Sequence, residues 1–162
     1  MKKIFVPVLA IFMCVCLLTA CGNTKTLNDT PLSEAMDKIN AEVFGGTENM
    51  RVIDSLDKLE LYYDIDPADV KEFAAEVAKN SATEIDEVIL IKAVDEEAAK
   101  RVAEKLELRL QAQKDLCASY SAELLAVADK CSVRTQGGVL VSLIITEQYD
   151  TAIKICDDLL FG

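Results

Sequence analysis

The sequence predicts an α+β fold, in which a small and mainly antiparallel sheet of three or four strands is covered on one face by a long helix and a C-terminal helix. Two runs typical of strands, residues 130–136 and 139–145, flank Gly137-Gly138. Adjacent glycines supply the positive φ angles that a tight hairpin turn requires. Residues 95–124 carry apolar side chains at steps of three and four, the pattern of a helix that lies on a core.

Two helices and a short extended stretch precede the sheet as a helical N-terminal extension. The first helix begins at Thr30-Pro31, because proline is favoured at the first helical position, and it ends at Gly45-Gly46. Residues 50–53 are expected to be extended. Ser55 can then cap a brief helix that runs to Tyr62.

Residues 70–79 fit two interpretations. Their apolar side chains recur at helical spacing, but they also alternate with Glu72, Ala74 and Glu76, as they would in a strand. The abundance of alanine and glutamate favours the helix. Residues 85–93 are rich in β-branched and apolar residues, which predicts a buried strand.

The long helix begins after Asp95, which can cap it, and its apolar stripe continues to Leu124. Glu97 lies one turn before Arg101, so these two side chains are expected to pair. After the second strand of the hairpin, Thr146 is expected to cap the C-terminal helix.

The first twenty residues have the parts of a secretory signal peptide: two lysines, an apolar run and a small residue before the cut. The run Leu18-Thr19-Ala20-Cys21 resembles the lipobox of bacterial lipoproteins, in which the cysteine thiol receives a diacylglycerol before cleavage. The alternative is an uncleaved membrane helix, but the apolar run has only about 17 residues and contains Pro7. We therefore expect a lipid on Cys21.

This interpretation divides the chain into three segments. Residues 1–20 are a signal peptide, residues 21–30 are the lipidated cysteine and a flexible polar tether, and residues 31–162 are a single α+β domain. The expected location is the extracytoplasmic face of the cell membrane, with the lipid as the anchor.

The predicted mature chain is strongly acidic. Removal of residues 1–20 leaves 15 basic and 28 acidic groups, which is a net charge of about −13. This charge repels phosphate backbones and argues against nucleic acid as a partner. It also opposes docking on anionic headgroups, so membrane contact is expected through the lipid on Cys21.

Histidine is absent from the chain. Its absence excludes Ser-His-Asp and Cys-His nucleophile pairs and histidine-ligated metals, and no cofactor is expected. Cys117, Cys131 and Cys156 remain after the predicted processing, and each falls on a predicted apolar face. This placement favours buried free thiols, while a single disulfide stays open as the alternative.

Asp64, Asp66 and Asp69 form a tight carboxylate cluster in a predicted loop and are the candidate site for a metal, namely calcium. An EF-hand loop needs a central glycine and a carboxylate at its twelfth position, and counting from Asp64 or Asp66 meets neither requirement. Aspartate followed by proline is itself typical of a turn or a helix cap. We therefore expect turn chemistry here rather than a metal site.

The order of three motifs resembles a known family: Tyr63-Asp64-Ile65-Asp66-Pro67, then Ser81-Ala82-Thr83-Glu84-Ile85, then the glycine hairpin. Over residues 59–160 the chain is similar to lipoproteins of Gram-positive anaerobes that carry domain of unknown function 4358. Asp64 stands where members of that family usually have a glycine. The resemblance implies that residues 70–79 form a strand, which gives the expected order β-β-α-β-β-α. The family carries no established activity.

These features predict a membrane-anchored, non-catalytic binding or interaction domain of unknown ligand, with an envelope protein or peptide as its partner. One alternative is a regulatory or structural subunit of a membrane complex. Another is a hydrolase that depends on carboxylates or a metal. An enzyme would bring acids with perturbed pKa values into one pocket, whereas an interaction protein would expose an apolar or tyrosine-bearing patch.

Overall fold

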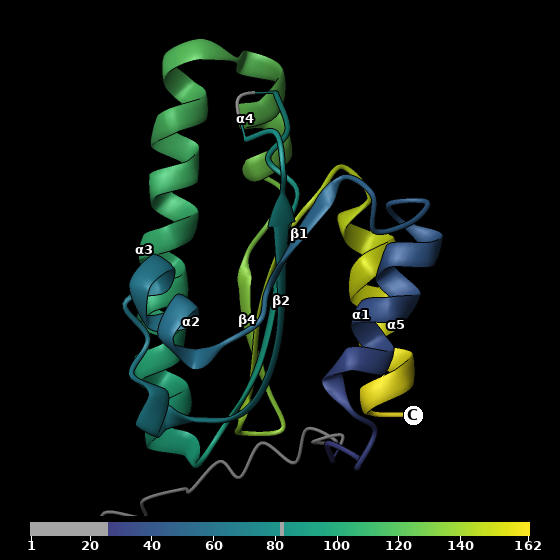
Figure 1. Cartoon of the computed structure of the whole chain (residues 1–162), viewed down its shortest axis with the longest axis vertical. Helices are drawn as coiled ribbons and strands as arrows, with labels where there is room; N and C mark the ends of the chain where they lie inside the picture. The colour runs from purple at the N-terminus through teal and green to yellow at the C-terminus, as the bar shows by residue number, and fades with distance from the viewer. Residues whose placement is uncertain (1–25, 82) are drawn as a thin grey trace, which may run out of the picture.

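The computed structural model of the protein describes residues 26–81 and 83–162 (Figure 1). The predicted signal peptide and the lipobox with Cys21 lie outside these residues. Within the described part of the chain, no helix is both long enough and apolar enough to cross a membrane. A five-stranded sheet stands at the centre, and helices lie on both sides of it.

The strand order is β1-β2-β3-β5-β4, and every neighbouring pair is antiparallel. The α+β class is therefore as predicted. The sheet has one strand more than the three or four predicted, because the short extended stretch at residues 50–53 pairs with β2. The strands are β1 (Met50–Ile53), β2 (Val70–Ala78), β3 (Glu87–Ala93), β4 (Val133–Gln136) and β5 (Leu140–Ile145).

The ambiguous segment at residues 70–79 is a strand, as the family resemblance implies. β2 lies between β1 and β3, with Phe73 opposite Ile91, so both of its edges are hydrogen-bonded. These two ladders outweigh the helix propensity of its alanines and glutamates. The predicted hairpin is also confirmed, because Gly137 and Gly138 have φ angles of 54° and 77° between β4 and β5.

Five α-helices and one 3₁₀ turn lie around the sheet in the described residues. The two predicted N-terminal helices are confirmed, and Ser55 Oγ accepts a hydrogen bond from Lys58 N at 3.4 Å at the start of the second. The elements are α1 (Leu32–Glu42), α2 (Leu56–Tyr63), the 3₁₀ turn η1 (Pro67–Asp69), α3 (Glu96–Tyr120), α4 (Ala122–Ala128) and α5 (Tyr149–Leu160).

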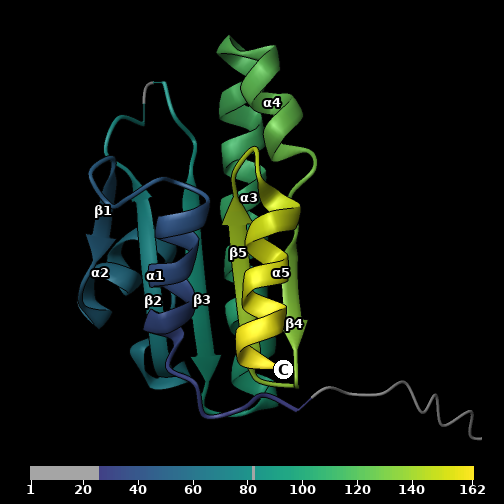
Figure 2. The same cartoon turned by 90° about the vertical axis from the view of Figure 1, so that its right-hand side faces the viewer.

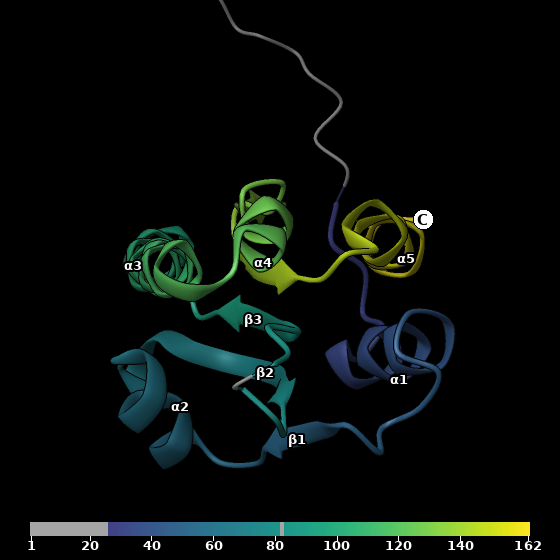
Figure 3. The ribbon, with the colours of Figure 1, turned by 90° about the horizontal axis from the view of Figure 1, so that it is seen from above.

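The helices cover both faces of the sheet, so the prediction that the long and C-terminal helices share one face is wrong. α2, α3 and α4 lie on one face, and α1 and α5 lie on the other (Figures 2 and 3). The cause is the composition of β3 and β5, which are buried on both sides at nearly every position. Ile89 and Ile145 belong to the core under α3, whereas Val88 and Ile144 belong to the core under α1 and α5.

Several helix boundaries differ from the prediction. Pro31 is the N-cap residue of the first helix instead of its first helical residue, and this helix ends at Glu42 instead of at Gly45-Gly46. The long helix ends at Tyr120 instead of Leu124, because the Ser121 hydroxyl accepts a hydrogen bond from Leu124 N at 3.3 Å and starts α4. Thr146 does not cap the last helix. It is buried after β5, and α5 begins at Tyr149 without a side-chain cap.

Residues 27–30 lie against the end of α5. Asn28 N donates to Leu160 O at 2.9 Å, and Asn28 Nδ2 donates to Leu159 O at 2.7 Å. Leu27 packs against the core under α1 and α5. The last carbonyls of a helix need donors from outside it, and Asn28 supplies two. Leu27 and Asn28, which the prediction assigns to the flexible tether before Pro31, are therefore packed against the domain.

The three cysteines in the described residues are free and buried. Cys117 and Cys131 lie in the core under α3, and Cys156 lies in the core under α1 and α5. The prediction of buried free thiols is confirmed.

Candidate functional site

The antiparallel pairing brings three connections together at one end of the sheet, which we call the far pole. β3 begins where β5 ends, with Glu87 opposite Ile145, so residues 84–86 and 146–148 are neighbours there. β1 begins at the same end, which adds the connection from α1 to β1. The Gly137-Gly138 turn lies at the opposite end, beside residues 27–30 (Figure 1).

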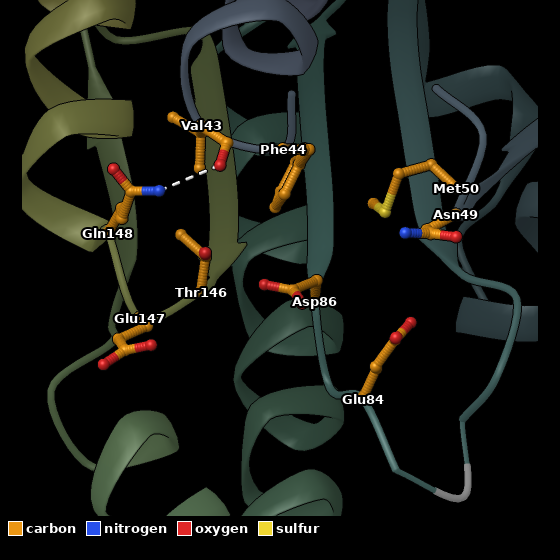
Figure 4. A pocket seen from close by; sticks show the side chains of 9 residues that line it. All are labelled: Val43, Phe44, Asn49, Met50, Glu84, Asp86, Thr146, Glu147 and Gln148. Atoms are coloured by element: carbon orange, nitrogen blue, oxygen red, sulfur yellow. Dashed lines mark hydrogen bonds between the residues drawn. The ribbon is translucent and has the colours of Figure 1, made fainter. Parts of the chain in front are cut away.

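A pocket of about 260 Å³ opens at the far pole (Figure 4). Glu84, Asp86 and Glu147 place three carboxylates around it, and a phenyl ring and a thioether add apolar surface. Gln148 Nε2 donates to Val43 O at 2.9 Å, which joins the start of α5 to the end of α1. The residues of this acidic pocket are Val43, Phe44, Asn49, Met50, Glu84, Asp86, Thr146, Glu147 and Gln148.

The environment of Asp86 disfavours its negative charge. Burial raises the pKa of Asp86 above its usual value, and a hydrogen bond from Thr146 opposes this rise. The neighbouring carboxylates Glu84 and Glu147 raise it further. A cation in the pocket would relieve this repulsion, so the pocket favours positively charged groups.

A second pocket of about 260 Å³ lies on the other side of residues 84–86 and shares Glu84 and Asp86 with the acidic pocket. It contains Glu87, which is 1% exposed. Arg109 Nε and Nη2 donate to the two oxygens of Glu87 at 3.0 and 2.8 Å, and Gln113 Nε2 donates at 3.1 Å. This buried carboxylate is therefore both paired and hydrogen-bonded.

Two tyrosines lie beside this ion pair and line a smaller pocket of about 110 Å³. Burial raises the pKa of Tyr63, whose hydroxyl is hydrogen-bonded to Glu87. Arg109 lies over the Tyr63 ring at 5.7 Å, and Arg51 lies over the Tyr62 ring at 6.0 Å. Tyr62 is 49% exposed. Further exposed apolar side chains on β1 and α2 are Val52, Leu56 and Leu61.

α3 presents a stripe of basic side chains at steps of four residues, and each of them pairs with a carboxylate from another element. The stripe therefore joins α3 to the end of α2, to η1 and to β3. The pairs are Lys105 with Asp64, Arg101 with Asp69, and Arg109 with Glu87.

The predicted pair of Glu97 with Arg101 is wrong. Arg101 donates to both carboxylate oxygens of Asp69, at 2.6 and 2.9 Å, and Glu97 pairs instead with Lys100 at 2.6 Å. The bidentate partner is buried and lies outside the helix, and helical spacing alone does not indicate it.

The structure brings Asp64, Asp66 and Asp69 to the lining of one pocket of about 330 Å³, together with Arg101 and Lys105. Asp66 Oδ1 accepts a hydrogen bond from Ala68 N at 2.8 Å and caps η1, while the Arg101 guanidinium lowers the pKa of Asp69. Across residues 26–81 and 83–162, no group of three or more histidine, cysteine or acidic side chains is placed to hold a metal ion. The three aspartates therefore have structural partners: Asp66 caps η1, and Asp64 and Asp69 form ion pairs with α3.

Asp64 ends α2 in the left-handed region, with φ at 56°. Glycine adopts this conformation without steric cost, and aspartate tolerates it better than most residues. The turn therefore has a geometry that suits the glycine implied at this position by the family resemblance, although a carboxylate occupies the position here.

The acids of the acidic pocket are not apparent from local sequence patterns. Asp86 and Glu147 come from connections that lie far apart in the chain. Their positions relative to the predicted strands could have indicated the pocket. Glu84 and Asp86 flank the start of the predicted strand at 85–93, and Glu147 follows the strand at 139–145. Pairing those two strands would have placed the three side chains at one end of the sheet.

A comparison of the sequence with known protein families identifies one that matches this chain. The family profile described as domain of unknown function (DUF4358) matches residues 45–146, which run from just before β1 to just after β5. No curated protein and no solved structure matches the chain. The match includes the acids Glu84 and Asp86 and the ion pair of Glu87 with Arg109, and it covers more than half of the chain. The chain therefore belongs to the DUF4358 family.

Proposed function

We propose that this chain is a bacterial lipoprotein, anchored by a lipid on Cys21 at the extracytoplasmic face of the cell membrane, whose acidic pocket binds a basic group of an envelope protein or peptide without catalysing a reaction. The signal-peptide pattern of residues 1–20 and the lipobox that follows support the anchor. The observation that carries the binding role is the convergence of Glu84, Asp86 and Glu147 around one open pocket.

The position and chemistry of the acidic pocket support this role. The pocket lies at the far pole, whereas residues 27–30, the described residues that are close to Cys21 in the sequence, lie at the opposite end of the sheet. The carboxylates attract a lysine or arginine head group, while Phe44 and Met50 offer apolar surface to the stem of such a side chain. The acidic surface as a whole would steer a basic partner toward the domain.

A tetralysine peptide tests the binding role on the full-length chain in detergent. Glu84→Gln/Asp86→Asn/Glu147→Gln removes the three charges of the pocket. We expect this variant to bind the peptide about tenfold more weakly than the wild type, measured by titration calorimetry at low ionic strength.

A matched variant separates the pocket from the overall charge. Glu34→Gln/Glu60→Gln/Glu107→Gln removes three charges at exposed positions outside the pocket and is expected to bind nearly as well as the wild type. Equal weakening in both triple variants would show that binding follows net charge, and the proposed pocket would then be wrong.

Cys21→Ala tests the anchor independently. The wild type is expected in the membrane fraction with the mass of a diacylglycerol added, and the variant is expected to lack that mass. A variant that is still lipid-modified and processed as before would contradict the proposal.

A second candidate is a carboxylate-dependent hydrolase, which the raised pKa of Asp86 beside Glu147 favours. A general acid needs such a raised pKa near neutral pH. In this case the wild type would hydrolyse members of a panel of nitrophenyl glycosides and esters, and Asp86→Asn would lose that activity. Tetralysine binding without turnover of any substrate in the panel would favour the binding role.

A further inference from the structure

Two buried polar side chains join α1 to β2 on the face opposite α3. Glu76 in β2 is 6% exposed, and Asn40 near the end of α1 is 3% exposed. Asn40 Nδ2 donates to Glu76 Oε1 at 3.1 Å. At the other end of α1, Leu32 N donates to Glu72 Oε1 at 2.6 Å. Two glutamates on one side of β2 therefore hold the two ends of α1.

The contact between Asn40 and Glu76 leaves two buried oxygens without a hydrogen bond. Within the described residues, Asn40 Oδ1 and Glu76 Oε2 have no donor. An ionised carboxylate only accepts hydrogen bonds, and an amide oxygen also only accepts, so these two atoms cannot satisfy each other in the charged state. Leaving a buried acceptor unsatisfied is costly, which makes this arrangement unusual for a native protein.

One proton placed between these two oxygens would give each of them a hydrogen-bond partner. We propose that Glu76 is held as the neutral acid, that its Oε2–H donates to Asn40 Oδ1 while Asn40 Nδ2 donates to Oε1, and that this closed acid–amide ring is a pH-sensitive latch holding α1 on the sheet. The proton comes from solvent when the pH falls and returns to solvent when the pH rises. The O–H bond on Glu76 is the one covalent bond that changes in this step.

The groups around Glu76 favour its neutral form. In the sheet it lies opposite Val52 of β1 and Val88 of β3, which offer no charge. From α1, Asp37 faces it with a negative charge. Burial raises the pKa of Glu76, Asp37 adds to this rise, and the hydrogen bond from Asn40 offsets it only in part.

The latch is strongest in acid. Between the ordinary glutamate pKa of 4.5 and the raised pKa of Glu76, the docked helix keeps a proton that the released helix loses. Over that window, the equilibrium constant for release of α1 is expected to rise about tenfold for each pH unit. Above the raised pKa both states are ionised, and the constant levels off.

Hydrogen exchange of the α1 amides, corrected for intrinsic exchange rates, measures this release on the full-length chain in detergent. Glu76→Gln keeps the ring, because its amide can donate to Asn40 Oδ1 and accept from Asn40 Nδ2, but it cannot titrate. Its release constant is expected to stay constant over the window in which the wild-type constant rises. Glu72→Gln is the matched control, since it removes a carboxylate from the same side of β2 but leaves Glu76 and Asn40 in place, so it should keep the wild-type rise of the release constant.

Carbon-13 NMR of the Glu76 side-chain carboxyl provides a second measurement that needs no variant to fold. Its titration midpoint is expected above the ordinary glutamate value. A midpoint at or below that value would overturn the proposal. So would a Glu76→Gln release constant that follows the wild-type pH dependence.

Discussion

The two faces of the sheet bury a carboxylate in different ways. On the α3 face, Glu87 is hydrogen-bonded to a guanidinium, an amide and a phenol. On the α1 face, Glu76 receives one hydrogen bond, from Asn40. The two glutamates lie in adjacent strands, with Glu76 opposite Val88 and Glu87 opposite Val77, so the sheet itself does not cause the difference. The difference comes from the helix that covers each face, because α3 offers long basic side chains to Glu87 whereas α1 offers only the short amide of Asn40 to Glu76.

Removing the cation from the α3 face tests this comparison most severely. Arg109→Met keeps an apolar stem but leaves the charge of Glu87 buried without its ion-pair partner. We expect the free energy of unfolding to fall by about 3–5 kcal/mol, measured by urea denaturation. Glu87→Leu/Arg109→Met should recover most of that loss, because no unpaired charge remains. A double variant as unstable as the single one would show that the pair itself stabilises the fold.

The two cores can be compared through neighbouring residues of β5. Ile144 and Ile145 are both fully buried, the first under α1 and α5 and the second under α3. Ile144→Ala and Ile145→Ala are each expected to lower the free energy of unfolding by about 3 kcal/mol. Because the side chains point to opposite faces, the double variant should show the sum within about 0.5 kcal/mol. A large departure from that sum in thermal or urea unfolding would mean that the two cores do not act independently.

The turn at Asp64 gives a smaller effect on the α3 face. Asp64→Ala and Asp64→Gly both remove the pair with Lys105, so their difference isolates the backbone conformation. We expect Asp64→Ala to be less stable than Asp64→Gly by about 1 kcal/mol, because alanine is strained at positive φ. Equal urea midpoints for the two variants would contradict the left-handed turn.

Thiol labelling compares the opening of the two cores without a change in stability. Burial raises the pKa of Cys156 to about 12, and Asp157 adds to the rise, so thiolate is scarce at ordinary pH. Burial also raises the pKa of Cys117 in the other core. At about pH 8, both cysteines should react slowly with iodoacetamide in the native protein and quickly in urea, as measured by peptide mass spectrometry. Fast native labelling of Cys156 alone would show that the core under α1 and α5 opens more readily.

Features governed by local chemistry were predictable from the sequence. The hairpin follows from the φ angles open to Gly137 and Gly138, and the start of α2 follows from the side chain of Ser55. Coverage of both faces was not predicted, although β3 and β5 lack the alternation of a half-exposed strand. An apolar run shows that both sides are buried, but it does not identify the helix that covers each side.

Contacts between segments that lie far apart in the chain could not be predicted from the sequence, for a different reason. The pair of Glu87 with Arg109 and the meeting of Asp86 with Glu147 depend on which strands pair and on which face α3 packs. In a chain with 28 acidic residues, no spacing rule distinguishes these carboxylates from exposed ones. The break at Ser121 is an intermediate case, because serine is a common cap but also occurs inside helices.

The two hydrogen bonds of Asn28 have a mechanical consequence. A force that pulls on the chain from its N-terminal side acts on the packing of Leu27 and on the hydrogen bonds of Asn28 to Leu159 and Leu160 at the end of α5. The contacts of Leu27 and Asn28 with the last turn of α5 thus protect the sheet from part of this force. Shortening the chain at its C-terminal end would remove that protection before it disturbed the acidic pocket at the far pole.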